Sequence, residues 1–510
     1  MTATNILILA TIVAYLALVV FIGFKCSKQN KDTDDFYLGG RKLGPFVTAM
    51  SAEASDMSSW LLLGLPGVAY LSGLADASWT AIGLALGTYL NWLIVAKKIR
   101  RYSIKVDAIT VPEFFSKRYR DKKNILQFVA ALIIIIFFIP YTGSGFSACG
   151  KLFNSLFGVN YHTALIVSAI VIAVYTTLGG FLAASTTDFI QSIVMTIAII
   201  VVFGFGATVA GGWGAVMDNA KELPGYLSLV ATHSVADASS KPYSALSIAS
   251  TMAWGLGYFG MPHILLRFMA ARKESELKLS RRIASVWVVI SMAVAILIGV
   301  VGLGMSNVGA IVKLEGSNSE TVLVKIAELL ASKGWICTVV AGVILAGVLA
   351  ATMSTADSQL LAAASSVTED ILSSKFGVKV KAKTQMIIAR VAVIAISCIG
   401  IFVAWNPDSS VFKIVSFAWA GFGATFGPVV LLALFWKRSN FQGAAAGMVA
   451  GAVMVFVWKF VIAKLGGVFA IYELLPAFIV AIIVNVVVAL LTKAPSEDMI
   501  KEFEEVKAEK

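Results

Sequence analysis

Four acidic side chains stand inside otherwise apolar stretches of the sequence, and they are the first candidates for chemistry. They are Glu53, Asp56, Asp188 and Asp357. A carboxylate in apolar surroundings is costly unless water, a cation or hydrogen-bond donors compensate it, so each of these residues indicates a functional position. Glu53 and Asp56 are three residues apart, which puts both carboxylates on one face of a helix.

Oxygen-bearing side chains accompany the acidic residue at position 357. Ser354, Asp357 and Ser358 follow the i, i+3, i+4 spacing of one helix face. Such an oxygen-only set suits a hard, weakly held cation, and Asp188 offers a further carboxylate that can meet them. The serines alone are equally typical of a packing surface between helices, so the acidic residue is what favours a cation.

Glycine, proline and polar residues interrupt two apolar stretches. Residues 51–60 hold four serines and two acids and are followed by Gly64, Pro66 and Gly67. Residues 254–263 hold three glycines and a proline, which are poor helix formers. Interrupted backbone survives in a membrane only where it lines a cavity or is buried in protein, and paired interruptions in two halves indicate the central site of a transporter. Two independent packing kinks are the alternative.

The remaining reactive residues give no sign of catalysis. The four cysteines and three histidines are scattered, so they indicate neither a disulfide framework nor a zinc site. The sequence has no His-Glu-x-x-His, Gly-x-Ser-x-Gly or Gly-x-x-x-x-Gly-Lys-Ser/Thr motif. An enzyme is therefore not expected. A passive channel or a sensor is a further alternative, although no signalling domain follows the last apolar stretch.

Composition places these residues in a membrane. Of 510 residues, 58% are hydrophobic and 14% are charged. Soluble domains carry roughly 45–50% apolar and about 25% charged residues, so a soluble globular protein is excluded. We expect an all-α polytopic membrane protein, because a crossing takes about 20 apolar residues. Thirteen crossings are predicted, near residues 5–25, 45–73, 76–97, 124–157, 161–178, 183–210, 243–270, 283–306, 335–370, 384–404, 410–436, 441–464 and 468–492.

The two interrupted crossings are five apart, which predicts an inverted five-plus-five repeat. The organisation follows in six parts. They are residues 1–44 (first transmembrane helix and basic cytoplasmic loop), 45–210 (first repeat), 211–242 (extracellular loop), 243–436 (second repeat), 437–492 (two additional helices) and 493–510 (cytoplasmic tail, expected as a short solvated helix).

Basic residues predict the orientation. Of the 41 Lys and Arg, 30 fall in the odd-numbered connections and the tail, whereas the long connection 211–242 has only Lys221 and Lys241. The positive-inside rule then places the N-terminus outside and the C-terminus in the cytoplasm, in a multi-pass protein of the cytoplasmic (inner) membrane. The net charge of +12 is spread over helix ends, so it indicates contact with the lipid bilayer and not with nucleic acid.

Several motifs resemble those of the sodium/solute symporter family, in order and over nearly the whole chain. They are Gly39-Gly40-Arg41, Leu43-Gly44-Pro45-Phe46, Ala54-Ser55-Asp56-Met57-Ser58, Trp254-Gly255-Leu256-Gly257-Tyr258-Phe259-Gly260, Met353-Ser354-Thr355, Thr368-Glu369-Asp370 and Ala418-Trp419-Ala420-Gly421-Phe422-Gly423-Ala424. Within the family the sequence is most similar to members that carry proline. The resemblance implies a LeuT-like core of two inverted repeats, alternating access, and import of proline coupled to Na+.

The resemblance also implies which residues bind. The sodium site would consist of the backbone carbonyls of Ala54, Met57 and Ala351 and the hydroxyls of Ser354 and Thr355. Neutral oxygens fit a monovalent cation that must also leave. The substrate pocket would contain Trp60, Tyr141, Trp254, Tyr258, Met261 and Pro262, and the coupling or gating residues would be Arg41, Glu53, Asp56 and Ser58.

Four positions differ from the pattern of the proline-carrying members. Those members have a small residue at the position of Glu53, glycine at Ser59, glutamine at Met261 and serine at Asp357. Ser59 and Met261 border the implied pocket, so another small amino acid or a monocarboxylate, coupled to sodium or protons, is the alternative substrate.

The aspartate at 357 bears on a second cation. In sialic-acid transporters of the family a second sodium site matches Asp188, Ser354, Asp357 and Ser358, and we expect a possible second cation site there. Glu53 is left with two interpretations, a neutral buried acid or a partner of a lysine or arginine.

Overall fold

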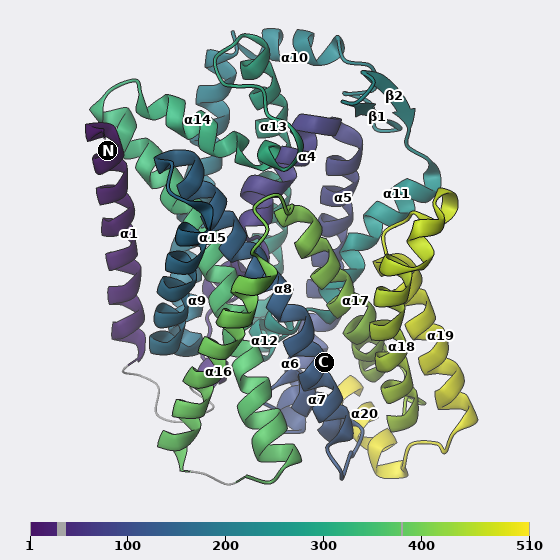
Figure 1. Ribbon diagram of the computed structural model, residues 1–510. Coiled ribbons are helices and arrows are strands. Elements are labelled where there is room, and N and C mark those ends of the chain that lie inside the picture. The colour runs from purple at the N-terminus through teal and green to yellow at the C-terminus, as the bar shows by residue number, and fades with distance from the viewer. Residues whose placement is uncertain (1, 28–36, 379–380, 509–510) are drawn as a thin grey trace.

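Helices form almost the whole molecule. The computed structural model describes residues 2–27, 37–378 and 381–508. Within these residues the strands are β1 (Ala231–Ser234) and β2 (Ser239–Pro242), which pair as a short antiparallel hairpin. The other elements run between two ends of a helical bundle, with the N-terminus near the upper end and the C-terminal helix near the lower end (Figure 1).

Ten helical spans in the described part of the chain are long and apolar enough to cross a membrane, and Trp60–Ser72 and Tyr161–Thr177 are shorter apolar helices. The prediction of an all-α polytopic membrane protein is therefore confirmed. The helices are α1 (Ala3–Ser27), α3 (Pro45–Asp56), α4 (Leu65–Ser72), α5 (Leu74–Leu90), α6 (Ala96–Lys105), α7 (Val111–Arg118), α8 (Ile125–Phe157), α9 (Tyr161–Val209), α10 (Trp213–Lys221), α11 (Ala245–Met252), α12 (Pro262–Ala270), α13 (Leu277–Asn307), α14 (Val322–Ala331), α15 (Trp335–Ser365), α16 (Ala382–Val403), α17 (Val411–Phe435), α18 (Phe441–Phe460), α19 (Leu474–Leu491) and α20 (Glu497–Ala508).

The first interrupted stretch is a broken helix, as the sequence predicts. Helix α3 ends at Asp56, and Met57 leaves helical geometry with φ −78° and ψ 72°. A π-helical turn over Trp60–Gly64 then leads into α4, which carries Pro66 in its first turn. The polar run and the proline together prevent a continuous α-helix here.

The second interrupted stretch is broken as well. Between α11 and α12 the chain forms 3-10 turns over Ala253–Gly260, and Met261 is extended before Pro262 begins α12. The glycines allow close approach to neighbours. A Cβ on Gly257 would lie 1.9 Å from Nε1 of Trp419 on α17, so this position has no room for a side chain.

Helix α9 contains a third irregularity. Gly180 has φ 71° and ψ −178°, a backbone conformation that favours glycine, so the helix bends between two apolar halves. The two halves correspond to the crossings predicted over residues 161–178 and 183–210.

Both broken helices contact the continuous helix α15, through α3 and α12. Helix α15 is buried along most of its length and packs against α9, α8 and α1. Helix α3 packs against α15, α9 and α12, which brings both breaks close to α15. Helices α18 and α19 pack on each other and on α17 at one side of the bundle (Figure 1).

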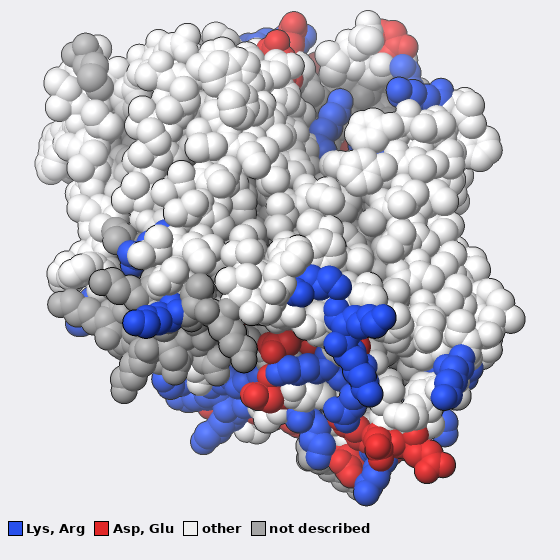
Figure 2. Space-filling view, turned by 60° about the horizontal axis from the view of Figure 1, so that its bottom comes forward, with Lys and Arg blue, Asp and Glu red and all other residues white. Residues whose placement is uncertain are grey.

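Charged side chains gather on one end of the bundle. Figure 2 brings the lower end of Figure 1 forward and shows Lys, Arg, Asp and Glu concentrated there, while the flanks above are mostly uncharged. Helix α6 alone contributes five basic residues to this end, and each of them is exposed or partly buried. Four basic residues of the sequence prediction, Lys28, Lys31, Lys379 and Lys510, lie outside the described residues.

The C-terminal tail differs from the expected solvated helix. Met499, Phe503 and Val506 make one face of α20 that is buried against the bundle. Glu502 and Glu505 on α20 form ion pairs with Arg120 (2.5 Å) and Lys105 (2.9 Å). The apolar residues of the tail fall on one helix face, so this docking follows from their spacing in the sequence.

Replacing Gly257 by alanine tests the close contact between the second broken helix and α17. The added methyl group would collide with Trp419, and overpacking of this kind costs ~1–3 kcal/mol or more. We expect Gly257→Ala to lower the melting temperature of the detergent-purified protein. Gly204→Ala on α9 is the control, because a Cβ there meets nothing within 4 Å. Equal melting temperatures for the two variants would contradict the contact.

Candidate functional site

The residues proposed for the sodium site come together at the first helix break. The backbone oxygen of Ala54 accepts a hydrogen bond from Ser354 Oγ at 2.8 Å and lies 3.5 Å from Thr355 Oγ1. Both hydroxyls also reach the oxygen of Ala351, at 3.1 and 3.2 Å. All four residues are buried, so this is a compact group of neutral oxygens shared between α3 and α15.

The break also frees backbone oxygens. The amide of Ser58 donates to the oxygen of Asp56, and the amide of Leu61 donates to the oxygen of Ser58. In a regular α-helix the amide of Ser58 would donate to the oxygen of Ala54 and the amide of Leu61 to the oxygen of Met57. Here both amides donate elsewhere, so these two oxygens lack their helical partners. Carbonyls without a helical partner are suitable ligands for an alkali cation.

Asp56 connects the two broken helices. Its Oδ2 accepts a hydrogen bond from the hydroxyl of Tyr258 at 2.5 Å. Its backbone oxygen accepts from Trp60 Nε1 at 3.0 Å and from the Tyr141 hydroxyl at 3.2 Å. Its other carboxylate oxygen, Oδ1, is buried and has no hydrogen-bond partner within the described residues. The site therefore keeps one buried carboxylate oxygen available beside the aromatic side chains.

Aromatic rings cluster beside the first break. Trp60 and Trp254, one from each broken helix, have ring centroids 6.0 Å apart. Tyr258 packs edge-on against Trp419 at 5.1 Å. Met261 and Pro262 are buried at the start of α12. Of the six residues predicted for the substrate pocket, Trp60, Tyr141, Trp254 and Tyr258 therefore lie together around Asp56 and the first break. Met261 and Pro262 follow Tyr258 in the chain, and Pro262 lines a separate small cavity with Ile134 and Leu266.

Three further aromatic residues complete this cluster and were missed by the sequence analysis. Phe412 and Tyr472 lie 5.2 Å from Trp254 between ring centroids, and Trp419 donates its indole N–H to the oxygen of Trp254. Trp419 stands in one of the motifs that carry the family resemblance but was given no role there, and nothing in the sequence separates Phe412 and Tyr472 from the many other aromatic residues of the apolar runs. Only their position in the fold reveals them.

Glu53 has hydrogen-bond donors around it. Its Oε1 accepts from the Thr88 hydroxyl at 3.0 Å and from Trp92 Nε1 at 2.8 Å, while Oε2 has no partner within the described residues. Of the two interpretations left open by the sequence, these neutral donors favour a buried acid over an ion pair. Thr88 and Trp92, on α5 and the turn that follows it, were not anticipated.

An arginine occupies the region expected to hold a second cation. Arg267 on α12 is buried and forms an ion pair with Asp188 Oδ2 at 3.1 Å. The same guanidinium donates to Ser358 Oγ at 2.5 Å and to Ser51 Oγ at 3.0 Å. Asp357 lies beside it, bonded through Oδ1 to Ser358 at 3.2 Å. The structure therefore unites Asp188, Asp357 and Ser358, and it adds a cation that the sequence analysis did not identify.

One signal in the sequence could have revealed Arg267. It is a basic residue inside the seventh apolar stretch, where uncompensated charge is as costly as for the acids. Asp188 and Asp357 are both buried near the single guanidinium of Arg267. When both acids are ionised, the group therefore has one negative charge that Arg267 does not balance. Oδ2 of Asp357 has no partner within the described part of the chain.

Arg41 lies toward the lower end of the bundle and bonds to several elements. Its guanidinium donates to the backbone oxygens of Met269 (2.8 Å) and Ala108 (2.6 Å) and to Ser103 Oγ (3.0 Å). It thereby ties the segment before α3 to the end of α12. Ser58, the other residue assigned to coupling, lies in the break, where its Oγ accepts from the Trp60 amide at 3.4 Å.

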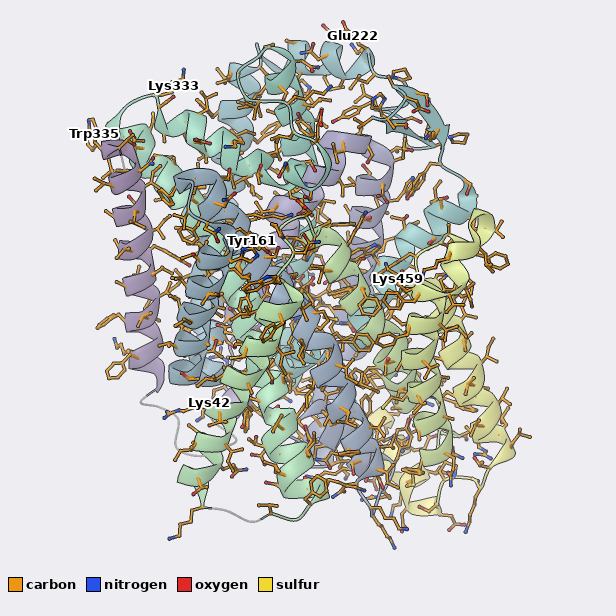
Figure 3. All side chains as sticks on the ribbon, in the orientation of Figure 1. Lys42, Tyr161, Glu222, Lys333, Trp335 and Lys459 are labelled. Carbon is orange, nitrogen blue, oxygen red and sulfur yellow. The ribbon has the colours of Figure 1, made fainter. Side chains whose placement is uncertain are left out.

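A buried ion pair lies toward the upper end. Lys151 Nζ is 2.8 Å from Glu320, and Glu320 accepts hydrogen bonds from the first two amides of α17, at Val411 and Phe412. Lys151 also lines a cavity of about 490 Å³, which Tyr161, labelled in Figure 3, borders as well. This pair was not predicted, and it connects the cavity to Phe412 of the aromatic cluster.

The oxygens at the break fit a sodium ion better than a divalent cation. They are carbonyls and hydroxyls without formal charge, which hold a monovalent ion weakly enough for release. The adjoining aromatic cluster, with one available carboxylate oxygen, suits a small zwitterion that has an apolar part.

Known proteins resemble this chain over most of its length. The model of the sodium:solute symporter family matches residues 36–451. The sodium/proline symporter of Staphylococcus aureus (strain USA300 / TCH1516) is 42% identical over 493 residues, which cover 95% of this chain and 92% of that protein.

Solved structures share the fold. A substrate-bound, outward-open Na+-coupled sialic acid symporter has a TM-score of 0.76 at 18% identity, covering 96% of this chain and 99% of its own. Mhp1, a nucleobase-cation-symport-1 family transporter in a closed conformation, has a TM-score of 0.55 at 14% identity, covering 93% and 99%.

The ion pair of Arg267 can be tested without reference to transport. Removing one partner of a buried pair leaves an uncompensated charge and costs ~3–5 kcal/mol, whereas removing both is much milder. We expect Arg267→Gln to lower the melting temperature strongly and Asp188→Asn/Arg267→Gln to recover most of the loss.

Lys221→Gln is the control for this cycle, because Lys221 pairs with Asp218 at the exposed surface. Its melting temperature should equal that of the unmodified protein. If the two changes at Asp188 and Arg267 were simply additive, the coupling seen in the structure would be wrong.

Proposed function

The chain belongs to the sodium:solute symporter family, and on this premise we propose that it imports proline with sodium across the cytoplasmic membrane by alternating access. One observation carries the proposal. The oxygens of Ala54, Ser354 and Thr355 lie together at the break of the first helix, next to Asp56 and its bond to Tyr258 of the second broken helix. Ion and substrate positions are thus adjacent.

Coupling follows from which elements supply the ligands. A sodium ion at this site would be held by the carbonyls of Ala54, Met57 and Ala351 and the hydroxyls of Ser354 and Thr355. It would therefore fix α3 relative to α15. The substrate residues come from both broken helices, so fixing the first break positions them, and sodium binding raises the affinity for proline. The same coupling free energy must act in the reverse direction.

The pocket chemistry supports proline. Trp60, Trp254 and Tyr258 offer aromatic surface for the pyrrolidine ring, and the N-terminal end of the half-helix that follows a break can receive a carboxylate. The available oxygen of Asp56 suits the secondary ammonium group. The sodium/proline symporter of Staphylococcus aureus, by its name, supports the same substrate. Because Ser59 and Met261 differ from the proline-carrying pattern, another small amino acid or a monocarboxylate is the second candidate.

We also propose thirteen crossings with an inverted five-plus-five core. Ten long spans, the two shorter apolar helices and the broken unit from α11 to α12 together give this number. Crossings two to six and seven to eleven form the repeats, each beginning with a broken helix. The remaining boundaries follow the six parts predicted from the sequence.

The proposed orientation places the N-terminus outside. The basic end seen in Figure 2 then faces the cytoplasm, and the hairpin of β1 and β2 faces outward with α10 and α14. In Figure 1 the N-terminal end of α1 lies toward the upper end of the bundle and α20 toward the lower end, which supports an odd number of crossings.

A second cation is proposed at Asp357. Arg267 pairs with Asp188, so the charge of Asp357 would be balanced by a bound sodium ion or by a proton. Coupling a second charge would matter for accumulation, since each charge crossing at −100 mV supplies about 2.3 kcal/mol, or roughly 50-fold in the concentration ratio.

Uptake into proteoliposomes tests the proposed function. We expect proline to accumulate against its gradient only when a sodium gradient is imposed. Ser354→Ala removes a ligand, and we expect the sodium concentration for half-maximal uptake to rise roughly tenfold or more. Ser397→Ala is the control, because its hydroxyl bonds only within α16 in the described structure. Uptake that persists after collapse of the sodium gradient would contradict sodium coupling.

The second cation is tested by Asp357→Ser. If Asp357 binds a cation or a proton, the variant should change the Hill slope for sodium or the pH profile of uptake, and the charge moved per proline should fall. Simultaneous current and flux measurements report that charge. A second cation site at Asp357 would be wrong if the Hill slope for sodium, the pH profile of uptake and the charge moved per proline all stayed unchanged in this variant.

A further inference from the structure

A groove of about 500 Å³ lies at the flank of the bundle near its basic end. It is formed where α5 passes into α6 and where α13 begins. Its lining combines charged and apolar side chains, namely Trp92, Leu93, Lys97, Glu274, Leu277, Lys278 and Arg281, together with Ser275. None of these residues, apart from the contact of Trp92 with Glu53, belongs to the site described above.

The groove has an excess of positive charge. Lys97 is 2.8 Å from Glu274, and Arg101 pairs with the same carboxylate at 2.6 Å, so this acid is already compensated. Lys278 and Arg281 add two positive charges, and the Arg281 guanidinium is held 5.3 Å above the ring of Tyr89. A ligand with a negative charge is therefore favoured.

Apolar surface continues from the groove along the flank. On α5 and the turn after it, Leu86, Tyr89, Leu90 and Leu93 are 42–50% exposed. On α13, Val286, Val289 and Ile290 are 48–58% exposed. In a membrane-spanning bundle these side chains face acyl chains. The groove thus combines a cationic end with an adjoining hydrocarbon-facing strip, at the boundary where Lys and Arg meet lipid headgroups.

We propose that this groove is a binding site for an anionic phospholipid, with its phosphate at Lys278 and Arg281 and its acyl chains along α5 and α13. A soluble anion would use the charges but not the apolar strip. An acidic protein segment would use the charges but would have to displace lipid from the strip. The combination of the two surfaces favours a lipid, and basic pockets between helices on the cytoplasmic side have this chemistry.

The groove has a direct connection to the interior. Trp92 forms part of its lining and donates its indole N–H to Glu53 Oε1 at 2.8 Å. Its ring also packs 4.5 Å from Phe268 of α12. A lipid in the groove therefore contacts a side chain that supports both broken helices, at α3 through Glu53 and at α12 through Phe268.

Native mass spectrometry of the full-length protein in detergent with equal amounts of phosphatidylglycerol and phosphatidylcholine tests the proposal. We expect the unmodified protein to retain phosphatidylglycerol preferentially. Lys278→Gln/Arg281→Gln should weaken this retention by roughly 30-fold, since each basic residue near an anionic surface contributes about fivefold in affinity.

Lys273→Gln/Arg282→Gln is the matched control, because it removes the same charge from the same region and neither residue lines the groove. It should retain phosphatidylglycerol like the unmodified protein. Equal losses in both variants would show diffuse surface attraction and overturn the site, as would unchanged retention in Lys278→Gln/Arg281→Gln. Displacement of the lipid by millimolar inorganic phosphate would identify a free anion as the occupant and also overturn it. Melting temperatures of both variants establish that each is folded.

Discussion

A break in a membrane helix requires that its neighbours satisfy the backbone groups it leaves open, and the rest of the structure depends on this requirement. In hydrocarbon no water is present to do so. At the first break the oxygen of Ala54 is met by hydroxyls of α15, and the oxygen of Asp56 is met by Trp60 and Tyr141. In the protein without ligands, these side chains form hydrogen bonds with the backbone oxygens at the break. The same side chains and oxygens are the groups that would bind an ion and a substrate. Stability and binding thus compete for the same atoms.

Buried charge sets a second requirement. Arg267 meets Asp188, and Lys151 meets Glu320, so two ion pairs lie inside the bundle on different levels. Each pair joins elements that are far apart in the sequence, α9 to α12 and α8 to the turn before α14. Such pairs contribute little net stability but penalise any arrangement that separates them, which restricts the bundle to a few discrete states. Discrete states are what alternating access needs.

The sequence predicted most of what local composition controls. The breaks around Met57 and Gly257 are visible because polar, glycine and proline residues stand out against apolar runs, and Ser354 is visible through its spacing to Asp357. What could not be predicted depends on contacts between helices. Arg267 contacts Asp188, and Trp92 contacts Glu53, only once the helices that carry them have packed together. Phe412 differs from other phenylalanines only by its position in the fold. The docked face of α20 was readable from its periodicity but was not recognised.

The central claim is that sodium at the break and proline in the aromatic pocket bind with mutual dependence. Equilibrium binding of radiolabelled proline to the purified protein, measured over a series of sodium concentrations, tests this directly. We expect proline affinity to rise with sodium, and proline to raise the apparent sodium affinity by the same factor. Proline affinity that does not change with sodium, in protein that binds proline, would contradict it.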